Sequence, residues 1–309
     1  MRVPSLKALL LSAALAFTGC APVDMRQPPK EPDRPFTLKD GPDDPVTKYA
    51  LVVVGSTAYV TDTDLFWLNS TYVYEDLLDL GFKDENIEFV YADGNPDFDM
   101  PYNTDAVDAI RDHEFSDSED HRATESNLER IVRRFSEKVD DNDVFLVNIM
   151  THGTVLTLDM EGSEMYPHEL ADIIRTVKPG FGLLYVDACN SGSYIGLVSL
   201  RDYVVIASTQ PNSLGIVGTD FSSSRDFIEN LSDPVSDING DGLITVREAF
   251  ERSKVEGVEF MEDNPGIIHA LEKGSVYKVN LRPTMYIGND TSAGFYLVDL
   301  NEISYTGKK

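Results

Sequence analysis

A thiol and an imidazole each stand just after an apolar run of the sequence. His152 follows the run at 144–150, and Cys189 follows the run at 182–186 after Asp187 and Ala188. Continuous apolar runs of this length predict strands that are buried on both faces. Functional groups of an open parallel sheet collect at the carboxyl ends of its strands, so we expect the two side chains to meet at one edge. There, an imidazole could activate a thiol nucleophile or protonate its leaving group.

Small residues accompany both side chains. Gly153 follows the histidine and Gly192 lies near the cysteine. Glycine lets the backbone approach a substrate closely, and backbone N–H groups at this point could stabilise an oxyanion. Taken alone, a free cysteine is usually a small buried apolar residue. A single histidine is usually a satisfied polar residue, but the joint placement of the two favours a catalytic pair.

Two motifs carry a family resemblance: NIMTHG at 148–153 and YVDACNSGS at 185–193. They resemble those of the clan CD cysteine peptidases, and most closely those of the legumain family, peptidase family C13. The pattern of that family is a hydrophobic strand with His-Gly, then a second strand with an acidic residue and Ala-Cys-x-Ser-Gly-Ser. Asp187 stands where legumains have Glu. The resemblance covers roughly residues 48–232, through YALVVVGS, VYADG and VIASTQPNS.

The resemblance implies a caspase-like fold and a cysteine-type endopeptidase that acts on protein or peptide substrates. Cys189 would attack a peptide carbonyl, and His152 would protonate the leaving amine. The N–H groups of Gly153 and Cys189 would form the oxyanion hole. Two alternatives stay open. One is a transpeptidase or transamidase that uses the same pair with an amine in place of water, and the other is a non-catalytic calcium-binding lipoprotein.

Substrate recognition is expected to differ from that of legumains. Legumains carry an arginine after the first strand that helps to bind an asparagine side chain, whereas the stretch at 57–72, TAYVTDTDLFWLNSTY, has no basic residue. Asparagine-specific cleavage is therefore not expected. Ser208 and Asp220 lie in the segments that line this pocket in the family, and such an acidic pocket would prefer a basic or polar side chain.

The elements that must position these residues alternate along the chain. Strands are predicted at 49–54, 87–91, 144–150, 182–186 and 203–207, and helices at 66–80, 126–139, 167–177 and 246–256. This alternation indicates βαβ units and a mostly parallel sheet with helices on both faces. Together with the resemblance, it predicts an α/β fold, a caspase-like three-layer αβα sandwich. Residues 92–123 form an acidic excursion longer than an ordinary loop, and further strands are predicted at 276–279 and 295–298.

Residues 237–248, DINGDGLITVRE, match the loop of an EF-hand calcium site. Calcium prefers oxygen ligands, which this loop supplies at the required positions. The expected ligands at positions 1, 3, 5, 7, 9 and 12 are Asp237, Asn239, Asp241, the Leu243 carbonyl, Thr245 and Glu248, with the sharp turn at Gly242. We expect one structural calcium ion and no organic cofactor; the alternative is an acidic turn before a helix. A second acidic stretch, at 93–99, is interpreted as a solvated loop.

The first twenty residues, MRVPSLKALLLSAALAFTGC, have the form of a secretory signal: basic, then apolar, then small residues. The last four resemble the lipobox of bacterial lipoproteins, in which the cysteine is lipidated. Lipidation of Cys20 would hold the protein on a membrane of the cell envelope, facing away from the cytoplasm, at the outer membrane in a diderm cell. The alternative is an ordinary cleaved signal. Residues 21–46 hold seven of the sixteen prolines, which predicts an extended tether.

Composition limits the partners of the 309-residue chain. The net charge of −27 disfavours binding to nucleic acid and to anionic lipid headgroups. Cys20 and Cys189 are the only two cysteines, and their locations argue against a disulfide. The expected parts are a signal peptide at 1–20, a tether at 21–46, a peptidase domain at 47–256 that includes the calcium loop, and a β-rich C-terminal extension at 257–309. The sequence does not indicate the oligomeric state.

Overall fold

The computed structural model of the chain describes residues 45–56, 60–94, 121–195, 197–198, 200, 202–219, 221–273 and 275–287. The expected signal peptide, the tether up to residue 44, most of the acidic excursion and the strand predicted at 295–298 lie outside these residues. Among the described residues, no helix is both long enough and apolar enough to cross a bilayer.

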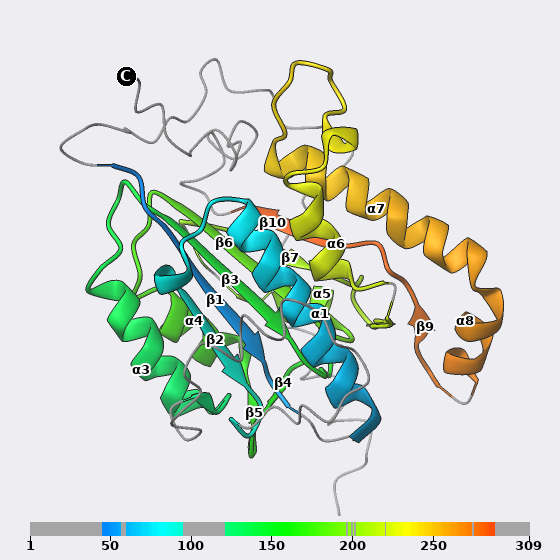
Figure 1. Cartoon of the computed structure of the whole chain (residues 1–309). Helices are drawn as coiled ribbons and strands as arrows, with labels where there is room; N and C mark the ends of the chain where they lie inside the picture. The colour runs from blue at the N-terminus through cyan, green and yellow to red at the C-terminus, as the bar shows by residue number, and fades with distance from the viewer. Residues whose placement is uncertain are drawn as a thin grey trace, which may run out of the picture. The chain divides into compact units, whose positions relative to one another are not determined.

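A six-stranded sheet forms the centre of the described fold, in the order β10-β7-β6-β3-β1-β2 (Figure 1). The strands are β1 (Lys48–Val54), β2 (Ile87–Tyr91), β3 (Val144–Met150), β6 (Phe181–Asp187), β7 (Tyr203–Ala207) and β10 (Thr284–Ile287). The first five run parallel, and β10 joins the edge of β7 antiparallel. The five strands predicted from the apolar runs are therefore confirmed, whereas β10 was not predicted.

Helices cover the sheet on both sides. Successive residues of β1 show this directly, because Val52 and Val54 pack with one group of buried side chains and Leu51 and Val53 with the other. The first group includes side chains from α1 (Val60–Asp79), α6 (Ser223–Asn230) and α7 (Val246–Asp263). The second includes side chains from α3 (Glu125–Ser136), α4 (Pro167–Ile174) and α5 (Ser191–Ile195). In Figure 1, α1 and α6 lie on the near side of the sheet. The fold is thus the expected α/β sandwich.

The sequence of α3 explains its place in this sandwich. Thr124 caps the helix by accepting a hydrogen bond from the Asn127 backbone N–H at 3.3 Å. The buried residues recur at helical spacing, so they form one apolar face against the sheet. They are Leu128, Ile131, Val132 and Phe135.

The boundary expected between 256 and 257 falls inside a helix, because α7 continues without a break to Asp263. Gly257 is not a helix stop: a Cβ atom there would lie 2.2 Å from the Leu281 carbonyl oxygen, so its lack of a side chain lets α7 approach the returning chain. The described residues after 257 are also not mainly strand. They form α8 (Pro265–Glu272), the short β9 (Lys278–Val279) and β10, which belongs to the central sheet.

Two short pairings complete the described fold. The hairpin of β4 (Leu158–Met160) and β5 (Ser163–Met165) follows the end of β3. The two-residue β8 (Ser213–Leu214) pairs in parallel with β9. Both pairings follow predicted site residues closely in sequence: β4 begins six residues after His152, and β8 begins five residues after Ser208.

Candidate active site

Strand register brings the thiol and the imidazole to one edge of the sheet. β3 and β6 are neighbours, and their last paired residues are Met150 and Asp187. His152 and Cys189 each follow two residues later, and Thr151 N–H still donates to the Asp187 carbonyl at 3.0 Å. Both residues line the same pocket, which has a volume of about 300 Å³. The strand-end placement expected from the apolar runs is therefore present in the structure.

The loop that carries His152 is held by contacts with β4 and with α1. The Asp159 N–H donates to the His152 carbonyl at 3.0 Å, and the Thr151 hydroxyl donates to the Asp159 carbonyl at 2.5 Å. The ring of Phe66, from α1, packs on the imidazole with ring centroids 5.0 Å apart. The β4 strand and α1 thus fix the backbone and the ring of this histidine.

Cys189 sits in a tight turn before α5. The next residue, Asn190, has a φ of +59°, a left-handed conformation that asparagine tolerates better than most residues. Its N–H donates to the Ser213 carbonyl at 2.7 Å, and its side chain donates to the Gly153 carbonyl at 3.3 Å. The Gly215 N–H donates to the Cys189 sulfur at 3.4 Å. The Cys189 thiol also donates to the Gly215 carbonyl at 3.9 Å, so the backbone of Gly215 holds the sulfur in place.

Gly153 allows the two loops to touch. A Cβ atom at this position would lie 2.8 Å from the Cys189 carbonyl oxygen and 3.1 Å from the Ala188 Cβ. Real Cβ atoms do not approach a backbone oxygen so closely, so only glycine fits without a shift. The backbone of Gly153 is therefore brought beside Cys189, as an oxyanion hole made by these two residues requires.

Asp187, at the end of β6, connects the cysteine turn to the segment that begins α6. It is buried, and its carboxylate accepts hydrogen bonds from the Ser222 hydroxyl at 3.1 Å and the Ser224 N–H at 2.9 Å. Burial raises the pKa of Asp187 above its usual value, while these hydrogen bonds act in the opposite direction. Sequence reasoning missed both serines, and the serine run at 222–224 was the only sign of them.

Of the two predicted pocket residues, Ser208 takes a different place and Asp220 lies outside the described residues. Ser208 is buried, and its hydroxyl accepts a hydrogen bond from the Ala188 N–H at 3.2 Å. It is not among the described residues that line the pocket. Ser208 therefore supports the backbone before Cys189, and its contact with a substrate stays a prediction.

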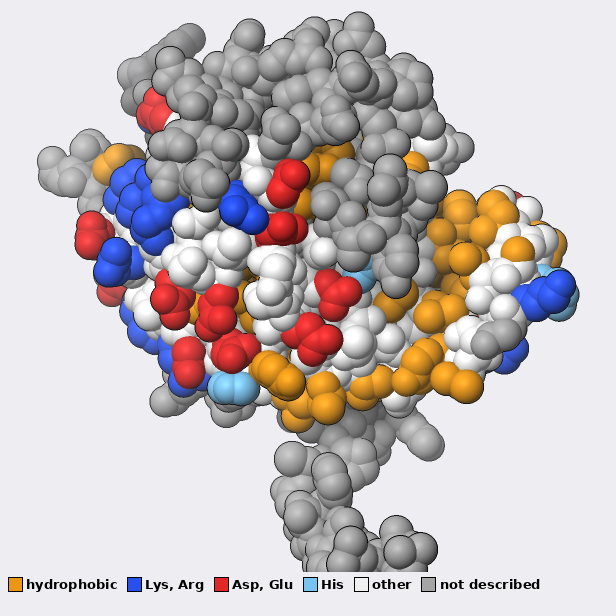
Figure 2. Space-filling model, turned by 90° about the horizontal axis from the view of Figure 1, so that it is seen from below, with side chains coloured by type: hydrophobic (Ala, Val, Ile, Leu, Met, Phe, Trp, Pro, Cys, Tyr) orange, Lys and Arg blue, Asp and Glu red, His pale blue; other side chains and the backbone are white. Residues whose placement is uncertain are grey.

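The described wall of the pocket is mainly apolar, which the sequence analysis did not anticipate. Its apolar side chains are Leu65, Phe66, Ala188, Ile216, Val217, Ile267 and Leu271. The parallel strands of Figure 1 run downward, so Figure 2 views their carboxyl ends, and it shows hydrophobic side chains gathered toward α8 at the right. Basic side chains gather instead over α3 at the left (Figure 2).

The predicted calcium loop is a tight turn in the structure. Asp237 accepts hydrogen bonds from the N–H groups of Gly240, Asp241 and Gly242 at 2.7, 3.2 and 2.9 Å. Gly240 and Gly242 have φ values of +75° and +87°, which favour glycine. Asn239 accepts from the Asp241 N–H at 2.8 Å. The turn thus gathers the first three expected ligands on one short loop.

Glu248 and Thr245 cap α7. The Glu248 carboxylate accepts from the Thr245 N–H at 3.0 Å, and Thr245 accepts from the Glu248 N–H at 3.2 Å. Within the described ranges, no three His, Cys, Asp or Glu side chains are grouped closely enough to hold a metal ion. Calcium prefers oxygen ligands of this type. In the structure, however, these oxygens accept hydrogen bonds within the turn and at the N-terminus of α7. Calcium binding therefore stays a prediction.

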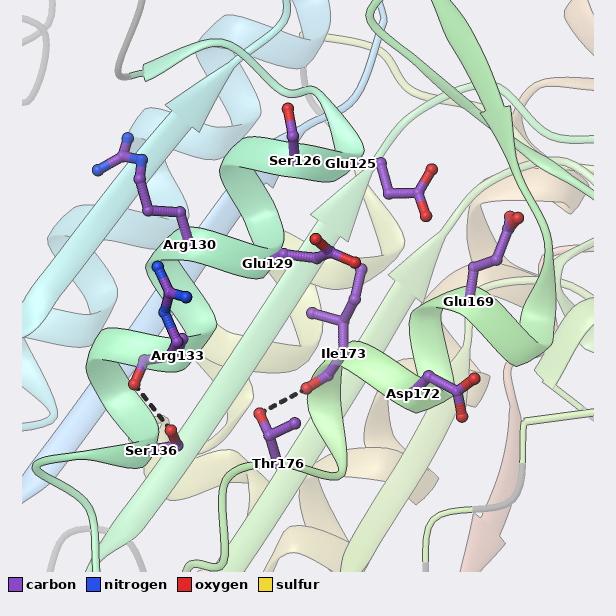
Figure 3. Close-up of a pocket in the computed structure, with 10 residues that line it drawn as sticks. All are labelled: Glu125, Ser126, Glu129, Arg130, Arg133, Ser136, Glu169, Asp172, Ile173 and Thr176. Atoms are coloured by element: carbon purple, nitrogen blue, oxygen red, sulfur yellow. Dashed lines mark hydrogen bonds between the residues drawn. The ribbon is translucent and has the colours of Figure 1, made fainter.

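A larger hollow of about 480 Å³ lies between α3 and α4 (Figure 3). It contains none of the predicted site residues. Ser136 and Thr176 donate to the Arg133 and Ile173 carbonyls of their own segments, at 2.7 and 2.8 Å. Its charged side chains are Glu125, Glu129, Glu169, Asp172, Arg130 and Arg133. The described lining contains neither a cysteine nor a histidine, so we assign the hollow no part in a cysteine-peptidase reaction.

Comparison with known proteins bears on the family and the fold. The family model described as the peptidase C13 family matches residues 48–215, more than half of the chain. No curated protein sequence matches. Caspase-1 from Spodoptera frugiperda is similar in structure, with a TM-score of 0.54 and 13% sequence identity over 85% of this chain and 95% of that chain. A structure of pro-sf-caspase-1 aligns with a TM-score of 0.48 and 13% identity over 79% of this chain and 92% of that chain. At this identity, the similarity to caspase-1 concerns the fold.

Proposed function

Because the chain belongs to the peptidase C13 family and is a cysteine-type peptidase, we propose that Cys189 and His152 are its catalytic pair. The observation that carries this proposal is their common position, two residues beyond the last register pair of adjacent strands and in one pocket. Its substrates are proteins or peptides, and its reaction is hydrolysis of an internal peptide bond.

The reaction follows from the groups in the pocket. His152 takes the proton of the Cys189 thiol, and the thiolate then attacks the peptide carbonyl carbon. A C–S bond forms, and the negative charge moves to the carbonyl oxygen beside the N–H groups of Gly153 and Cys189. The C–N bond then breaks as His152 gives a proton to the leaving amine. Water, deprotonated by His152, attacks the thioester, and the C–S bond breaks to release a carboxylic acid and the thiol.

Turnover of a protein substrate tests this proposal. The full chain is incubated with casein, and the new termini are identified by mass spectrometry with and without a free amine acceptor. We expect cleavage by the wild type and none by Cys189→Ala. Products joined to the added amine would show transamidation, and cleavage that persists in Cys189→Ala would contradict the assignment.

We propose that Cys20 carries a lipid that holds the peptidase on the cell envelope. The support is the sequence of the first twenty residues, which lie outside the described structure. Because the chain has only two cysteines, Cys20→Ser and Cys189→Ser form a matched pair. Metabolic labelling with a fatty-acid analogue is expected to mark the wild type and Cys189→Ser but not Cys20→Ser. Label that remains in Cys20→Ser would rule out this anchor.

We also propose that the loop at 237–248 binds one calcium ion with a structural role. Its support is the oxygen donors at EF-hand spacing and the tight turn around Asp237. Calcium is expected to raise the melting temperature of the wild type but not of Asp241→Ala. Asp233→Ala, which changes an acidic residue outside the loop, is the control. An equal response of all three proteins would contradict the site.

A further inference from the structure

The pocket beside Cys189 offers a substrate side chain an apolar surface. Phe66, Ile216 and Val217 come from α1 and from the segment after β8, and Ile267 and Leu271 come from α8. Ile267 and Leu271 are four residues apart, so they share one face of their helix. They are 47% and 44% exposed, which leaves them accessible to a ligand.

The polar side chains of the described wall are already engaged. Besides Cys189 and His152, the pocket is lined by Thr151 and Asp187. The Thr151 hydroxyl donates to the Asp159 carbonyl, and the Asp187 carboxylate accepts from Ser222 and Ser224. Asp187 is the one charged side chain among the described residues of this wall, and it is only 3% exposed. A charged substrate side chain would therefore lose its hydration against a mainly apolar surface.

The part of the pocket wall that α8 supplies is held against the loop of Gly215, whose N–H donates to the Cys189 sulfur. Ser213 and Leu214 of β8 pair with Lys278 and Val279 of β9, and Gly215, the donor to the Cys189 sulfur, comes next. Glu272 at the end of α8 accepts from the Val279 N–H at 3.1 Å and the Lys278 ammonium at 2.7 Å. Ile268 packs into a small cluster with Phe221 and Leu281. Because these contacts hold α8 in place, its apolar face is a defined wall.

We propose that this pocket selects a large apolar side chain on the residue whose carbonyl Cys189 attacks, and that Leu271 with Ile267 determines this preference. The inference rests on the proposed peptidase function. A volume of about 300 Å³ is at the lower end of the range for small-molecule sites, and it suits one side chain of the size of leucine, methionine or phenylalanine. The attacked carbonyl must lie at Cys189, so the side chain next to it is the one that reaches these walls.

Peptide electrophiles that differ only in this residue test the preference on the full chain. Acyloxymethyl ketones with leucine, phenylalanine, asparagine, aspartate or arginine at this position are compared by their rates of reaction with Cys189, together with iodoacetamide. We expect the leucine and phenylalanine probes to react about 10- to 100-fold faster than the other three, as burial of such a side chain allows. Equal rates, or faster reaction with a polar probe, would overturn the inference while leaving the peptidase function standing. Lack of reaction with every probe would overturn the peptidase function and this inference together.

Charged substitutions at Leu271 test whether this residue determines substrate preference or only supports the fold. Leu271→Glu is expected to shift the preference toward the arginine probe, and Leu271→Lys toward the aspartate probe, each by about 10-fold. Val276→Glu is the matched control: Val276 follows α8, is 89% exposed and does not line the pocket. If both Leu271 variants keep the wild-type order of probes, α8 does not form the selecting wall.

Discussion

At the scale of single residues, the site depends on the close contact of two loops. Gly153 lies against Cys189, and the Asn190 side chain donates to the Gly153 carbonyl, so the histidine loop and the cysteine turn support each other. The asparagine that follows Cys189 therefore has a structural role of its own. Asn190 adopts the left-handed turn and also ties the turn to the neighbouring strand end.

Gly153→Ala should reduce catalysis because its Cβ would push the Cys189 carbonyl and displace an oxyanion donor. We expect kcat/KM to fall about 10²-fold or more, the effect of removing one such donor. Gly218→Ala is the control, since the nearest atom to its Cβ would be the Phe221 carbonyl oxygen at 3.9 Å. Assay of both variants with one peptide substrate is sufficient, and equal activity of the two would contradict the role of Gly153.

The positions of the two proposed catalytic residues at neighbouring strand ends could be predicted from the sequence, but the walls of the pocket could not. Cys189 and His152 follow strong apolar runs, and parallel strands fix which ends meet. Ile267 and Leu271 reach the pocket only because β9 pairs with β8, and strands of two residues leave no periodic pattern to detect. Ser208 was placed in the pocket by resemblance, whereas its hydroxyl bonds to the Ala188 backbone.

At the scale of elements, three helices bring carboxylates together on one face of the sheet. Asp76 on α1 is near Glu229, Glu75 and Asp79, with Arg225 as the nearby cation. Asp226 on α6 is near Glu256 of α7 and Glu229, again with Arg225 nearby. Burial is the main cause that raises the pKa of Asp76 and of Asp226, each to about 7, and the neighbouring carboxylates add to it.

These raised pKa values predict that stability falls as pH increases from about 4 to about 7. In this window the folded state keeps protons that the unfolded state has released, so deprotonation favours unfolding. Asp76→Asn should therefore raise the free energy of unfolding at pH 8, by on the order of 1–3 kcal/mol, and have little effect at pH 4. Urea unfolding at both pH values measures this, with Asp141→Asn as the control, because Asp141 is exposed and is not among the carboxylates near Asp76. A loss of stability in Asp76→Asn at pH 8 would contradict the account.

Two helical glycines should respond in opposite directions to the same change. Gly257→Ala should lower the free energy of unfolding by about 1–3 kcal/mol, because the Cβ would meet the Leu281 carbonyl at 2.2 Å and force overpacking. Gly266→Ala in α8 meets no atom within 4 Å, so the better helix propensity of alanine should stabilise the protein by up to about 1 kcal/mol. Thermal unfolding of the two variants distinguishes these signs. Stabilisation by Gly257→Ala would show that α7 does not depend on this contact.

Element prediction succeeded where apolar periodicity was strong and failed where it was weak. The five parallel strands and α3 were predicted close to their bounds. The start of α1 was placed at 66 rather than 60, because the polar stretch at 61–64 has no apolar period. The edge strand β10 follows Pro283 and is stabilised by its pairing with β7, a long-range contact that no local pattern reveals.

At the scale of the whole molecule, the chain combines a peptidase fold with a C-terminal segment that returns to it. After α7 and α8, the chain passes the cysteine loop at β9 and then enters the central sheet at β10. Within the described residues, the segment that was expected to form a β-rich extension thus adds a strand to the central sheet. The same segment that completes the sheet also supplies the outer wall of the pocket.

The reaction of Cys189 with a peptide electrophile is the measurement that tests the central claim most directly. Wild type, His152→Ala and the control His168→Ala, which changes an exposed histidine on α4, are treated at equal concentration and mapped by mass spectrometry. We predict one adduct on Cys189 in the wild type and in His168→Ala, and a rate at least about 10²-fold lower in His152→Ala, as expected for loss of a general base. Equal rates in all three proteins, or no adduct on Cys189, would contradict the catalytic pair.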